Sequence, residues 1–426
     1  MRFTKFNITA ARGVIINPAA RRGRRALLFL VCLALIFTYP IQIVYGNSEQ
    51  FFASNPNMRI GLVFGSGMTE SFQTTSEDGF LFGYVEYNAS DKFNVLSYSA
   101  NTKIRVTRNA ANNAAIVIDP DTDEILFQYL DSDNNFATVA ATESNKNLTN
   151  GQSITELSAQ NTGFTTTPAG NIYSGAFIYR TEGGGVEVIN LVSLEDYIKG
   201  VLPYEISPNW PEEAQKAFSI AVRSYSVRSI NRHASAGFML CNTTHCQVYR
   251  GGINATAGTN AAVDATKDLV AVFNNQVIEA VYHSSSGGVT ENNSDAWGTA
   301  RVAYLASVTV PHERYNTPNR ANSLWTNTVS PQELYEYLVG TSPQASRFRG
   351  TLDSAIANII INERSPSSNY IKSVTVTDRN GNSVTGRIQI PFEAHFQNTR
   401  TVQTWIYTDR LYSGVLSERE RAIITP

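Results

Sequence analysis

Short apolar runs separated by turn-forming residues dominate the segment from residue 57 to residue 170. Five of these runs, each seven or eight residues long, are rich in β-branched and aromatic residues. Runs of this length and composition are typical of β-strands. The predicted strands are residues 59–65, 80–87, 103–109, 114–120 and 124–130. The segment is therefore predicted to be a β-rich N-terminal module.

The pattern changes to a helical period after residue 193. Six apolar side chains recur at the spacing that places them on one face of a helix. They are Ala214, Ala217, Phe218, Ala221, Val222 and Tyr225. Pro211 and the acidic pair Glu212 and Glu213 mark the start of this helix, because proline and acidic side chains favour a helix N-terminus.

A shorter helix is predicted immediately before it. Ser193 is a suitable N-cap, with Asp196 three residues later in a capping-box pattern. Pro203 is expected to end this helix, since proline disrupts helical hydrogen bonding. Glu205 would then lie in the connector between the two helices.

The rest of the chain mixes strands and helices. A hairpin around a TEGGG turn precedes Ser193, two strands flank an Asn-Asn turn at residues 274–275, and a helix is predicted over residues 331–340. The pair Asn380-Gly381 predicts a further hairpin turn. Together these elements predict an α+β fold, with a mixed strand and helix core domain over residues 171–395 after the β-rich module of residues 57–170. Residues 396–426 are left as a C-terminal tail segment.

The N-terminal segment has the charge and hydrophobicity of a membrane signal. Residues 1–25 form a basic leader, and residues 26–45 are almost uninterruptedly apolar. An apolar run of about 20 residues is long enough to span a bilayer, and the basic residues ahead of it predict that the leader is cytoplasmic and the rest of the chain extracytoplasmic. We interpret the run as a signal anchor, with a cleaved signal peptide as the alternative. Residues 46–56 are interpreted as a tether.

The exported part of the chain is acidic. Without the seven basic residues of the leader, 27 basic residues remain against 36 acidic ones, a formal charge of −9. Nucleic-acid sites are basic. The charge therefore argues against nucleic acid as a partner.

Glu205 is the strongest candidate for acid chemistry. Its neighbours Leu202, Tyr204 and Ile206 are apolar. Apolar surroundings are expected to raise the pKa of a carboxyl group, and a carboxyl that keeps its proton near neutral pH can serve as a general acid. The alternative is that Glu205 is a solvated loop acid or a helix cap.

Three potential metal ligands lie within six residues: Cys241, His245 and Cys246. In an extracytoplasmic protein, a disulfide between the two cysteines is one interpretation. The other is a metal site completed by water or a fourth ligand. Cys32 lies in the apolar run and is interpreted as a buried apolar residue.

The chain resembles the stage II sporulation protein D and amidase-enhancer family in four segments that occur in the family's order. They are LEDYIKGVLPYEI, PEEAQKAFSIAVRSY, TTHCQVYRG and AVYHSSSGGVTENNSDAWG, within residues 170–390. The family's sporulation members are lytic transglycosylases that cut peptidoglycan glycan strands and prefer strands without stem peptides. The resemblance implies that Glu205 is the essential acid.

The resemblance also implies a substrate cleft and a metal. The residues that match the family's substrate-binding motifs are Arg223, Tyr225, Gln247, Tyr249, Tyr282, His283 and Ser284. From their residue types alone, Tyr282, His283 and Ser284 are equally compatible with a polar turn. Some family members carry the Cys and His set as a zinc site, which favours zinc at Cys241, His245 and Cys246 in a structural or substrate-positioning role.

The expected reaction is cleavage between MurNAc and GlcNAc by a single Glu, leaving a 1,6-anhydro-MurNAc end, in sporulation or wall remodelling. The expected partners are glycan strands, a cell-wall amidase or endopeptidase, and the membrane. Three alternatives remain: a non-catalytic enhancer of an amidase, a zinc amidase that uses the cysteine and histidine cluster, and a hydrolase with Glu291 or Asp295 as a second carboxylate.

Overall fold

The computed structural model of the chain describes most of residues 57–386, together with short strands at residues 46–47, 393–396, 402–403 and 421–424. Within residues 57–386 the description leaves out 88–90, 110–113, 129–135, 155–156, 158–161, 183, 284–285, 287–288, 311–327, 341–344 and 370. The predicted leader and apolar segment, residues 1–45, lie outside the described residues. Among the residues that are described, no helix is both long and apolar enough to cross a membrane.

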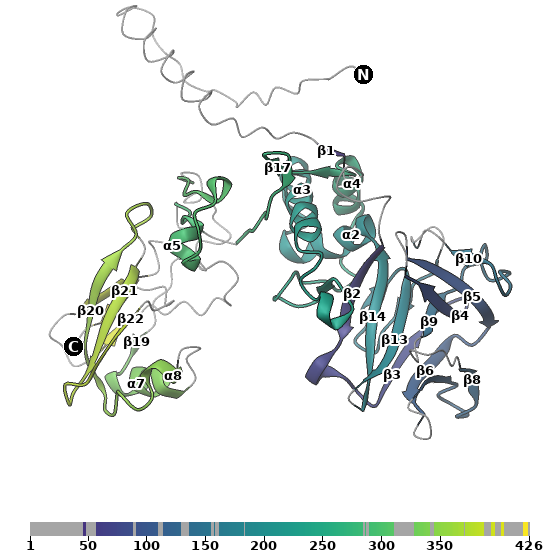
Figure 1. Ribbon diagram of the computed structural model, residues 1–426, viewed down its shortest axis with the longest axis horizontal. Helices are drawn as coiled ribbons and strands as arrows, with labels where there is room; N and C mark the ends of the chain where they lie inside the picture. The colour runs from purple at the N-terminus through teal and green to yellow at the C-terminus, as the bar shows by residue number, and fades with distance from the viewer. Residues whose placement is uncertain are drawn as a thin grey trace, which may run out of the picture. The chain divides into compact units, whose positions relative to one another are not determined.

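An eight-stranded sheet positions the elements that matter for function (Figure 1). Its strand order is β10-β5-β4-β9-β13-β14-β2-β15. Neighbouring strands are antiparallel, except that β15 runs parallel to β2. In this order the strands are Ser153–Ile154, Lys92–Ser99, Phe80–Glu86, Phe136–Ala140, Ala176–Glu182, Gly185–Ser193, Asn57–Val63 and Leu240–Cys241.

A six-stranded sheet accompanies it, in the order β12-β11-β3-β6-β7-β8. Its strands are Ile172–Tyr173, Thr165–Thr166, Ser71–Thr75, Lys103–Arg108, Ala115–Ile118 and Ile125–Gln128. One hydrophobic core contains residues of both sheets, including Phe82 of β4 and Val106 of β6. All nine residues of β14 are buried, so both faces of that strand are covered.

The predicted strands are confirmed as β2, β4, β6, β7 and β8, with ends shifted by a few residues. Strands β3, β5 and β9 were not predicted. The sequence of β3, SFQTT, is mostly polar, and β5 alternates between more and less buried positions. A half-exposed strand carries fewer apolar residues than a continuous run, which explains why an apolar-run search overlooks these two.

The sheet crosses the predicted domain boundary at residue 170. Strands β13 and β14 follow that boundary, yet they pair with β9 and β2 from the segment before it. The β-rich module and the core domain therefore share one sheet and one hydrophobic core.

Three helices follow β14: α2 (Leu194–Glu205), α3 (Glu212–Arg228) and α4 (Ala257–Ala265). They contact one another, and α2 also contacts β14 and β2. The predicted cap of α2 is present, because Ser193 Oγ accepts a hydrogen bond from the Asp196 backbone N–H at 3.2 Å. The predicted start of α3 after Pro211 is also confirmed.

The prediction that Pro203 ends the first helix is wrong. Helix α2 continues through Pro203 to Glu205, and the Ile206 N–H still bonds the Leu202 carbonyl at 3.0 Å. A proline in the last turn removes only one helical hydrogen bond, a cost that packing of the helix can offset. Glu205 is therefore the last helical residue and does not lie in the connector.

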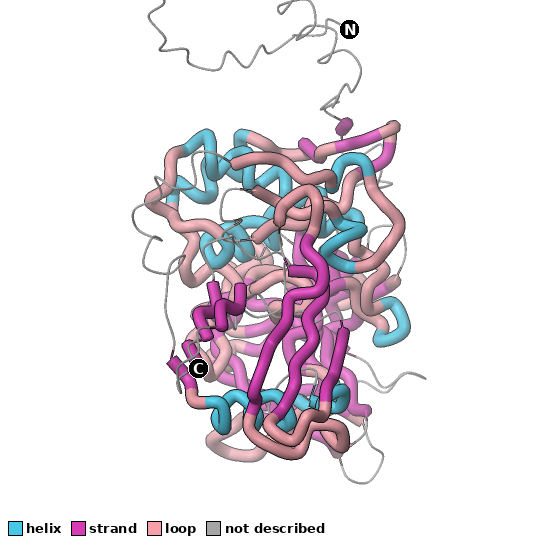
Figure 2. The backbone as a smooth tube through the Cα atoms, turned by 90° about the vertical axis from the view of Figure 1, so that its left-hand side faces the viewer, coloured by secondary structure: helices cyan, strands magenta, loops and turns pink. Residues whose placement is uncertain are grey.

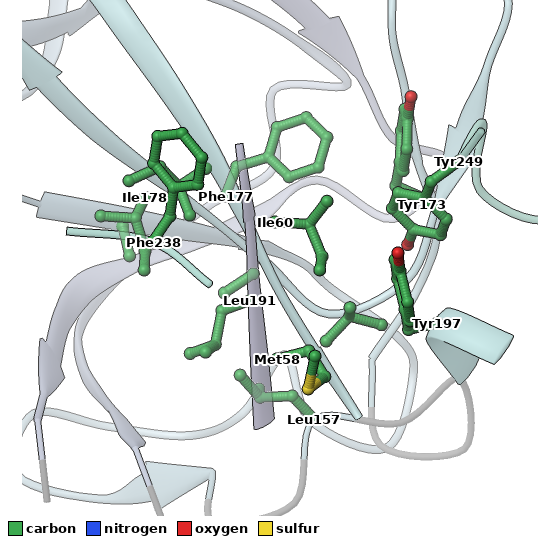
Figure 3. Packing of buried hydrophobic residues seen from close by; sticks show 14 of the residues in the cluster. Met58, Ile60, Leu157, Tyr173, Phe177, Ile178, Leu191, Tyr197, Phe238 and Tyr249 are labelled. Atoms are coloured by element: carbon green, nitrogen blue, oxygen red, sulfur yellow. The ribbon is translucent and has the colours of Figure 1, made fainter. Parts of the chain in front are cut away.

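Buried tyrosines join α2 to the sheet (Figure 3). The ring of Tyr197 on α2 lies 4.9 Å from that of Tyr249, which lies 5.5 Å from that of Tyr173 on β12. Gly200 leaves the space for this contact, since a Cβ there would lie 2.4 Å from Tyr249 Cε2. Tyr249 can therefore pack directly against the backbone of α2.

The C-terminal part has a separate hydrophobic core, formed by α7 (Pro331–Gly340), α8 (Ala345–Phe348) and the antiparallel sheet β20-β21-β22. Figure 2 shows these three strands side by side. They are Ile356–Arg364, Ile371–Asp378 and Ser383–Gly386. The predicted helix 331–340 is confirmed, and so is the hairpin turn, in which Gly381 has a φ of 88°.

We predict that Gly200→Ala destabilises the protein by about 1–3 kcal/mol, because an added methyl group would overpack Tyr249. The matched control is Gly258→Ala in α4, where the nearest atom to a new Cβ is 3.8 Å away. Alanine there is expected to be neutral or stabilising by up to about 1 kcal/mol. Denaturant titration of both variants checks this, and equal midpoints would show that Tyr249 moves aside without cost.

Candidate functional site

The carboxyl group of Glu205 is held at the C-terminal end of α2 by two hydrogen bonds. The Val248 backbone N–H donates to Oε1 at 3.0 Å, and the Tyr282 hydroxyl is the second partner. Burial raises the pKa of Glu205 above its ordinary value of 4.5, although both hydrogen bonds oppose the shift. The predicted direction of the pKa shift is confirmed. The group can thus hold a proton at a higher pH than a solvated glutamate.

Gln247 organises the polar groups behind this acid. Its Nε2 donates to the Tyr282 hydroxyl at 3.2 Å, and its Oε1 accepts from Ser226 Oγ at 2.8 Å and from the Tyr197 hydroxyl at 3.2 Å. Gln247 is 1% exposed, so this network lies inside the protein. It orients the Tyr282 hydroxyl toward Glu205, because the amide already occupies the acceptor side of that hydroxyl.

Tyr282 is packed between aromatic side chains of α3. Its ring lies 4.8 Å from that of Phe218 and 6.3 Å from that of Tyr225. Burial and the neighbouring Glu205 carboxyl raise the pKa of Tyr282 well above 10. The Tyr225 hydroxyl accepts from Arg232 at 2.6 Å, and burial raises its pKa to about 12. Both phenols therefore stay protonated and act as neutral hydrogen-bonding groups.

Arg223 lies inside the protein, 0% exposed. Its Nε and Nη2 donate to the two carboxylate oxygens of Glu195 at 2.9 and 2.7 Å, and Nη1 donates to the Leu269 carbonyl at 3.1 Å. This bidentate pair joins α3 to α2 and to β16 (Leu269–Val270). Arg223 is bonded to protein groups and is not exposed to solvent, whereas the resemblance implied that it contacts the substrate.

Tyr249 has a similar place, 1% exposed, and its hydroxyl donates to Asn190 Oδ1 at 2.8 Å. It packs against the backbone of α2, the helix that ends at Glu205, and does not face solvent. Of the other predicted substrate residues, His283 is half-buried, and Ser284 lies outside the described residues.

The two candidate second carboxylates are engaged elsewhere. Glu291 is buried and accepts hydrogen bonds from the hydroxyls of Ser365, Ser367 and Ser368. Asp295 pairs with Lys372 at 3.0 Å. These contacts attach the segment around α5 (Asn293–Trp297) to the loop between β20 and β21 and to the start of β21 itself.

Cys241, His245 and Cys246 converge as predicted, and a fourth residue joins them. The nitrogen and sulfur ligand atoms of these three residues and of His233 all lie within 4.8 Å of one another. Both cysteines are free thiols, so the disulfide interpretation does not apply to this structure. Their mutual hydrogen bond lowers the pKa of Cys241 and raises that of Cys246.

His233 was overlooked because it lies eight residues before Cys241, outside the compact C-x3-H-C cluster. The signal available in the sequence is weak: it is one of only five histidines in the chain. A turn after α3 places His233 beside the other three residues of the cluster. There its ring stacks on that of Phe238, with the ring centroids 4.8 Å apart. Arg180 donates to the Ala236 carbonyl at 2.7 Å and so holds that turn.

The four side chains fit a tetrahedral metal. The observed separations are 3.2 Å between His233 Nε2 and His245 Nδ1, and 3.4 to 3.7 Å for three of the four nitrogen–sulfur pairs, with all ligand atoms within 4.8 Å of one another. Zinc bond lengths in a regular tetrahedron require about 3.3 Å between nitrogens and about 3.6 Å between nitrogen and sulfur. Two thiols and two imidazoles are also the donor types that zinc prefers.

We predict that stability depends on pH through Glu205. A carboxyl whose pKa is raised on folding binds its proton more tightly in the folded state, so it costs stability as pH rises above 4.5 and costs nothing well below that value. The free energy of unfolding of Glu205→Gln should therefore exceed that of the native protein at neutral pH and approach it near pH 4. Denaturant titrations across this range measure the difference.

Glu77→Gln at an exposed position is the control for the loss of one carboxylate. A difference between Glu205→Gln and the native protein that stays constant from pH 4 to pH 7 would contradict the raised pKa.

Comparison with known proteins identifies the family to which this region corresponds. Residues 182–273 match the family described as Stage II sporulation protein. These residues include α2, α3, Glu205 and all four residues of the cysteine and histidine cluster.

Individual relatives match a longer stretch. An uncharacterized protein of Brachyspira hyodysenteriae is 36% identical over 175 residues, which are 41% of this chain and 46% of that protein. The amidase enhancer of Bacillus subtilis is 30% identical over 187 residues, 42% of this chain and 24% of its own length. Stage II sporulation protein D of Bacillus subtilis is 30% identical over 200 residues, 43% of this chain and 57% of its own length.

Each match thus spans between 24% and 57% of the relative's own length. The predicted resemblance is confirmed for the region that carries the site. Residues 182–273 of this chain are thus similar to the Stage II sporulation protein family, and the relatives that the chain matches include proteins named stage II sporulation protein D and amidase enhancer.

Proposed function

We propose that this protein is a lytic transglycosylase that cleaves peptidoglycan glycan strands between MurNAc and GlcNAc with Glu205 as its single acid and base. The observation that carries the proposal is the half-buried carboxyl of Glu205, held by the Val248 N–H and with its pKa raised by burial. Its described hydrogen-bond partners are a backbone N–H and a tyrosine hydroxyl, and neither is a carboxylate. Hydrolysis of a glycoside ordinarily uses two carboxyl groups.

A single carboxyl suffices if the sugar supplies its own nucleophile. Glu205 donates its proton to the glycosidic oxygen as the bond from that oxygen to C1 of MurNAc breaks. The C6 hydroxyl of the same MurNAc then bonds to C1, and its proton passes to the Glu205 carboxylate. The products are a 1,6-anhydro-MurNAc end and a free GlcNAc 4-hydroxyl, and Glu205 ends protonated as it began.

The partners of Glu205 suit both steps. The Val248 N–H and the Tyr282 hydroxyl stabilise the carboxylate that forms after the first proton transfer. Burial disfavours the ionised form and raises the pKa of the carboxyl group, which favours uptake of the proton in the second step. We assign Tyr282 to the reacting site, and Arg223, Gln247 and Tyr249 to positioning roles, because these three are buried and bonded to protein groups.

We further propose that His233, Cys241, His245 and Cys246 bind one zinc ion. Four protein ligands make a closed site, which is typical of structural zinc, whereas catalytic zinc keeps an open position. The metal would hold the turn after α3 and the segment around Cys246 together. This donor set disfavours the zinc amidase alternative.

The proposal includes an extracytoplasmic location, with anchoring by the apolar segment 26–45 and a role in sporulation or wall remodelling. A second candidate function is that of a non-catalytic enhancer of a wall amidase. It is favoured by the 30% identity to the Bacillus subtilis protein named amidase enhancer. Both functions require binding to glycan strands, but only the first releases anhydro-sugar products.

We predict that Glu205→Gln lowers the rate of anhydro-MurNAc release by about 10²- to 10⁴-fold, since general acid–base catalysis contributes that much. Gln keeps the volume of the side chain and removes the transferable proton. The rate is measured by mass spectrometry of products released from purified wall glycan, both with and without stem peptides.

Glu291→Gln and Asp295→Asn are the matched controls, because both carboxylates bond to other protein groups. They should retain activity. Loss of activity in either control together with retention in Glu205→Gln would exclude Glu205 as the acid. Glycan binding without any product from the native protein would favour the enhancer function.

We predict about one zinc per chain in protein purified under reducing conditions, with loss of the metal in Cys241→Ser, Cys246→Ser and His233→Ala. The His233 variant distinguishes a four-ligand site from the three-ligand cluster seen in the sequence. Loss of structural zinc should also lower the unfolding temperature, because metal binding contributes to folding. Elemental analysis and thermal unfolding measure the two effects.

Cys32→Ser is the control for the loss of one thiol and should keep its zinc. Absence of metal in the native protein, with Cys241 and Cys246 cross-linked in a peptide map, would contradict the proposed site.

A further inference from the structure

An exposed indole follows the candidate acid at short distance along the chain. Trp210 lies in the connector between α2 and α3, five residues after Glu205, and 46% of its surface is exposed. Five residues span at most about 17 Å, and a turn shortens this, because the Trp210 N–H bonds the Ser207 carbonyl at 3.0 Å. The backbone of Trp210 therefore lies within the length of a few sugar rings from the backbone of Glu205.

The connector is held rigidly. The side-chain Nε2 of Gln215, on the first turn of α3, donates to the Pro208 carbonyl at 2.9 Å and to the Trp210 carbonyl at 2.8 Å. Gln215 is only 4% exposed. Pro208 and Pro211 restrict the backbone on both sides of Trp210. A buried amide thus anchors the backbone of the residue whose own side chain faces solvent.

Single exposed apolar residues are common on protein surfaces and need no explanation by themselves. Trp210 differs because its backbone is clamped by a buried side chain and because its connector begins at the acid. A preorganised ring loses little conformational entropy when a ligand binds. Its face offers a large apolar and electron-rich surface, which is complementary to the apolar C–H face of a pyranose ring.

We propose that Trp210 is a stacking platform for a pyranose ring of the glycan strand, adjacent to the bond that Glu205 cleaves. This inference rests on the proposed function, since it assigns a subsite to the same glycan. The contact would fix the position of the strand along α2 and the connector. Trp210 is thus a specificity-determining residue that holds the substrate and takes no part in proton transfer.

The test uses the full chain with Glu205→Gln, so that no substrate is turned over, and chito-oligosaccharides of β-1,4-linked N-acetylglucosamine as the probe. Calorimetry is expected to show that adding Trp210→Ala weakens binding at least about 10-fold, as expected for the truncation of a tryptophan hot spot. Trp210→Phe should keep most of the affinity. Native tryptophan fluorescence should change on binding, and this change should disappear in Trp210→Phe.

Phe164→Ala is the matched control, because Phe164 is an equally exposed aromatic residue, 50% exposed, that precedes β11. It should leave binding unchanged, and the unfolding temperature of Trp210→Ala should stay near that of the parent. In the otherwise native enzyme, Trp210→Ala should raise KM more than it lowers kcat.

Two results separate failure of this inference from failure of the proposed function. Oligosaccharide binding that stays within about two-fold after Trp210→Ala overturns the stacking platform and leaves the proposed function intact. Absence of any glycan binding by the parent, in both the probe and purified glycan, overturns both. Loss of amidase stimulation with unchanged glycan affinity would instead assign Trp210 to a protein contact and overturn the platform.

Discussion

The packing of Tyr249 against the backbone of α2 is the contact on which the candidate site depends. Gly200 admits the ring, and Asn190 of β14 holds its hydroxyl at 2.8 Å. The segment from Cys246 to Arg250 is thereby fixed along the last turn of α2, so the Val248 N–H can reach Glu205. A residue inside the core thus determines where the proton of the acid is held. Close-packed interiors transmit small displacements. A methyl group added at residue 200 would therefore shift Tyr249 and, through the segment that follows Cys246, the hydrogen bond to the Glu205 carboxyl group.

The metal cluster and the acid share this same segment. Cys246 is a potential ligand, Gln247 orients Tyr282, and Val248 bonds Glu205. Since these three residues are consecutive, any interaction that fixes the Cys246 sulfur also limits where the Val248 N–H can lie. A metal bound by this cluster would therefore help to position the Val248 N–H that bonds Glu205, without contacting the carboxyl group itself. Such support of reacting groups by residues around them is common in catalytic sites.

Burial of polar groups is costly unless each one is bonded, and the site meets this condition with groups from distant parts of the chain. Arg223 neutralises Glu195, and Gln247 bonds both to its hydroxyl neighbours and to a carbonyl of α3. These bonds join α2, α3 and the sheet into one support. The carboxyl of Glu205 keeps two hydrogen-bond partners, and its pKa rises because burial outweighs the lowering effect of these bonds.

The sequence by itself determined several local features: the longer apolar strands, the capped helix after Ser193, the start of α3, the candidate acid and three of the four potential ligands. Periodicity, caps and turns are encoded within a few neighbouring residues, which is why they can be recognised without a fold. Only the tertiary structure decided that α2 continues past Pro203, that His233 completes the cluster, that Arg223 faces Glu195, and that one sheet crosses residue 170. Each of these depends on contacts between residues far apart in the chain, whose energies outweigh local preference and leave no local pattern.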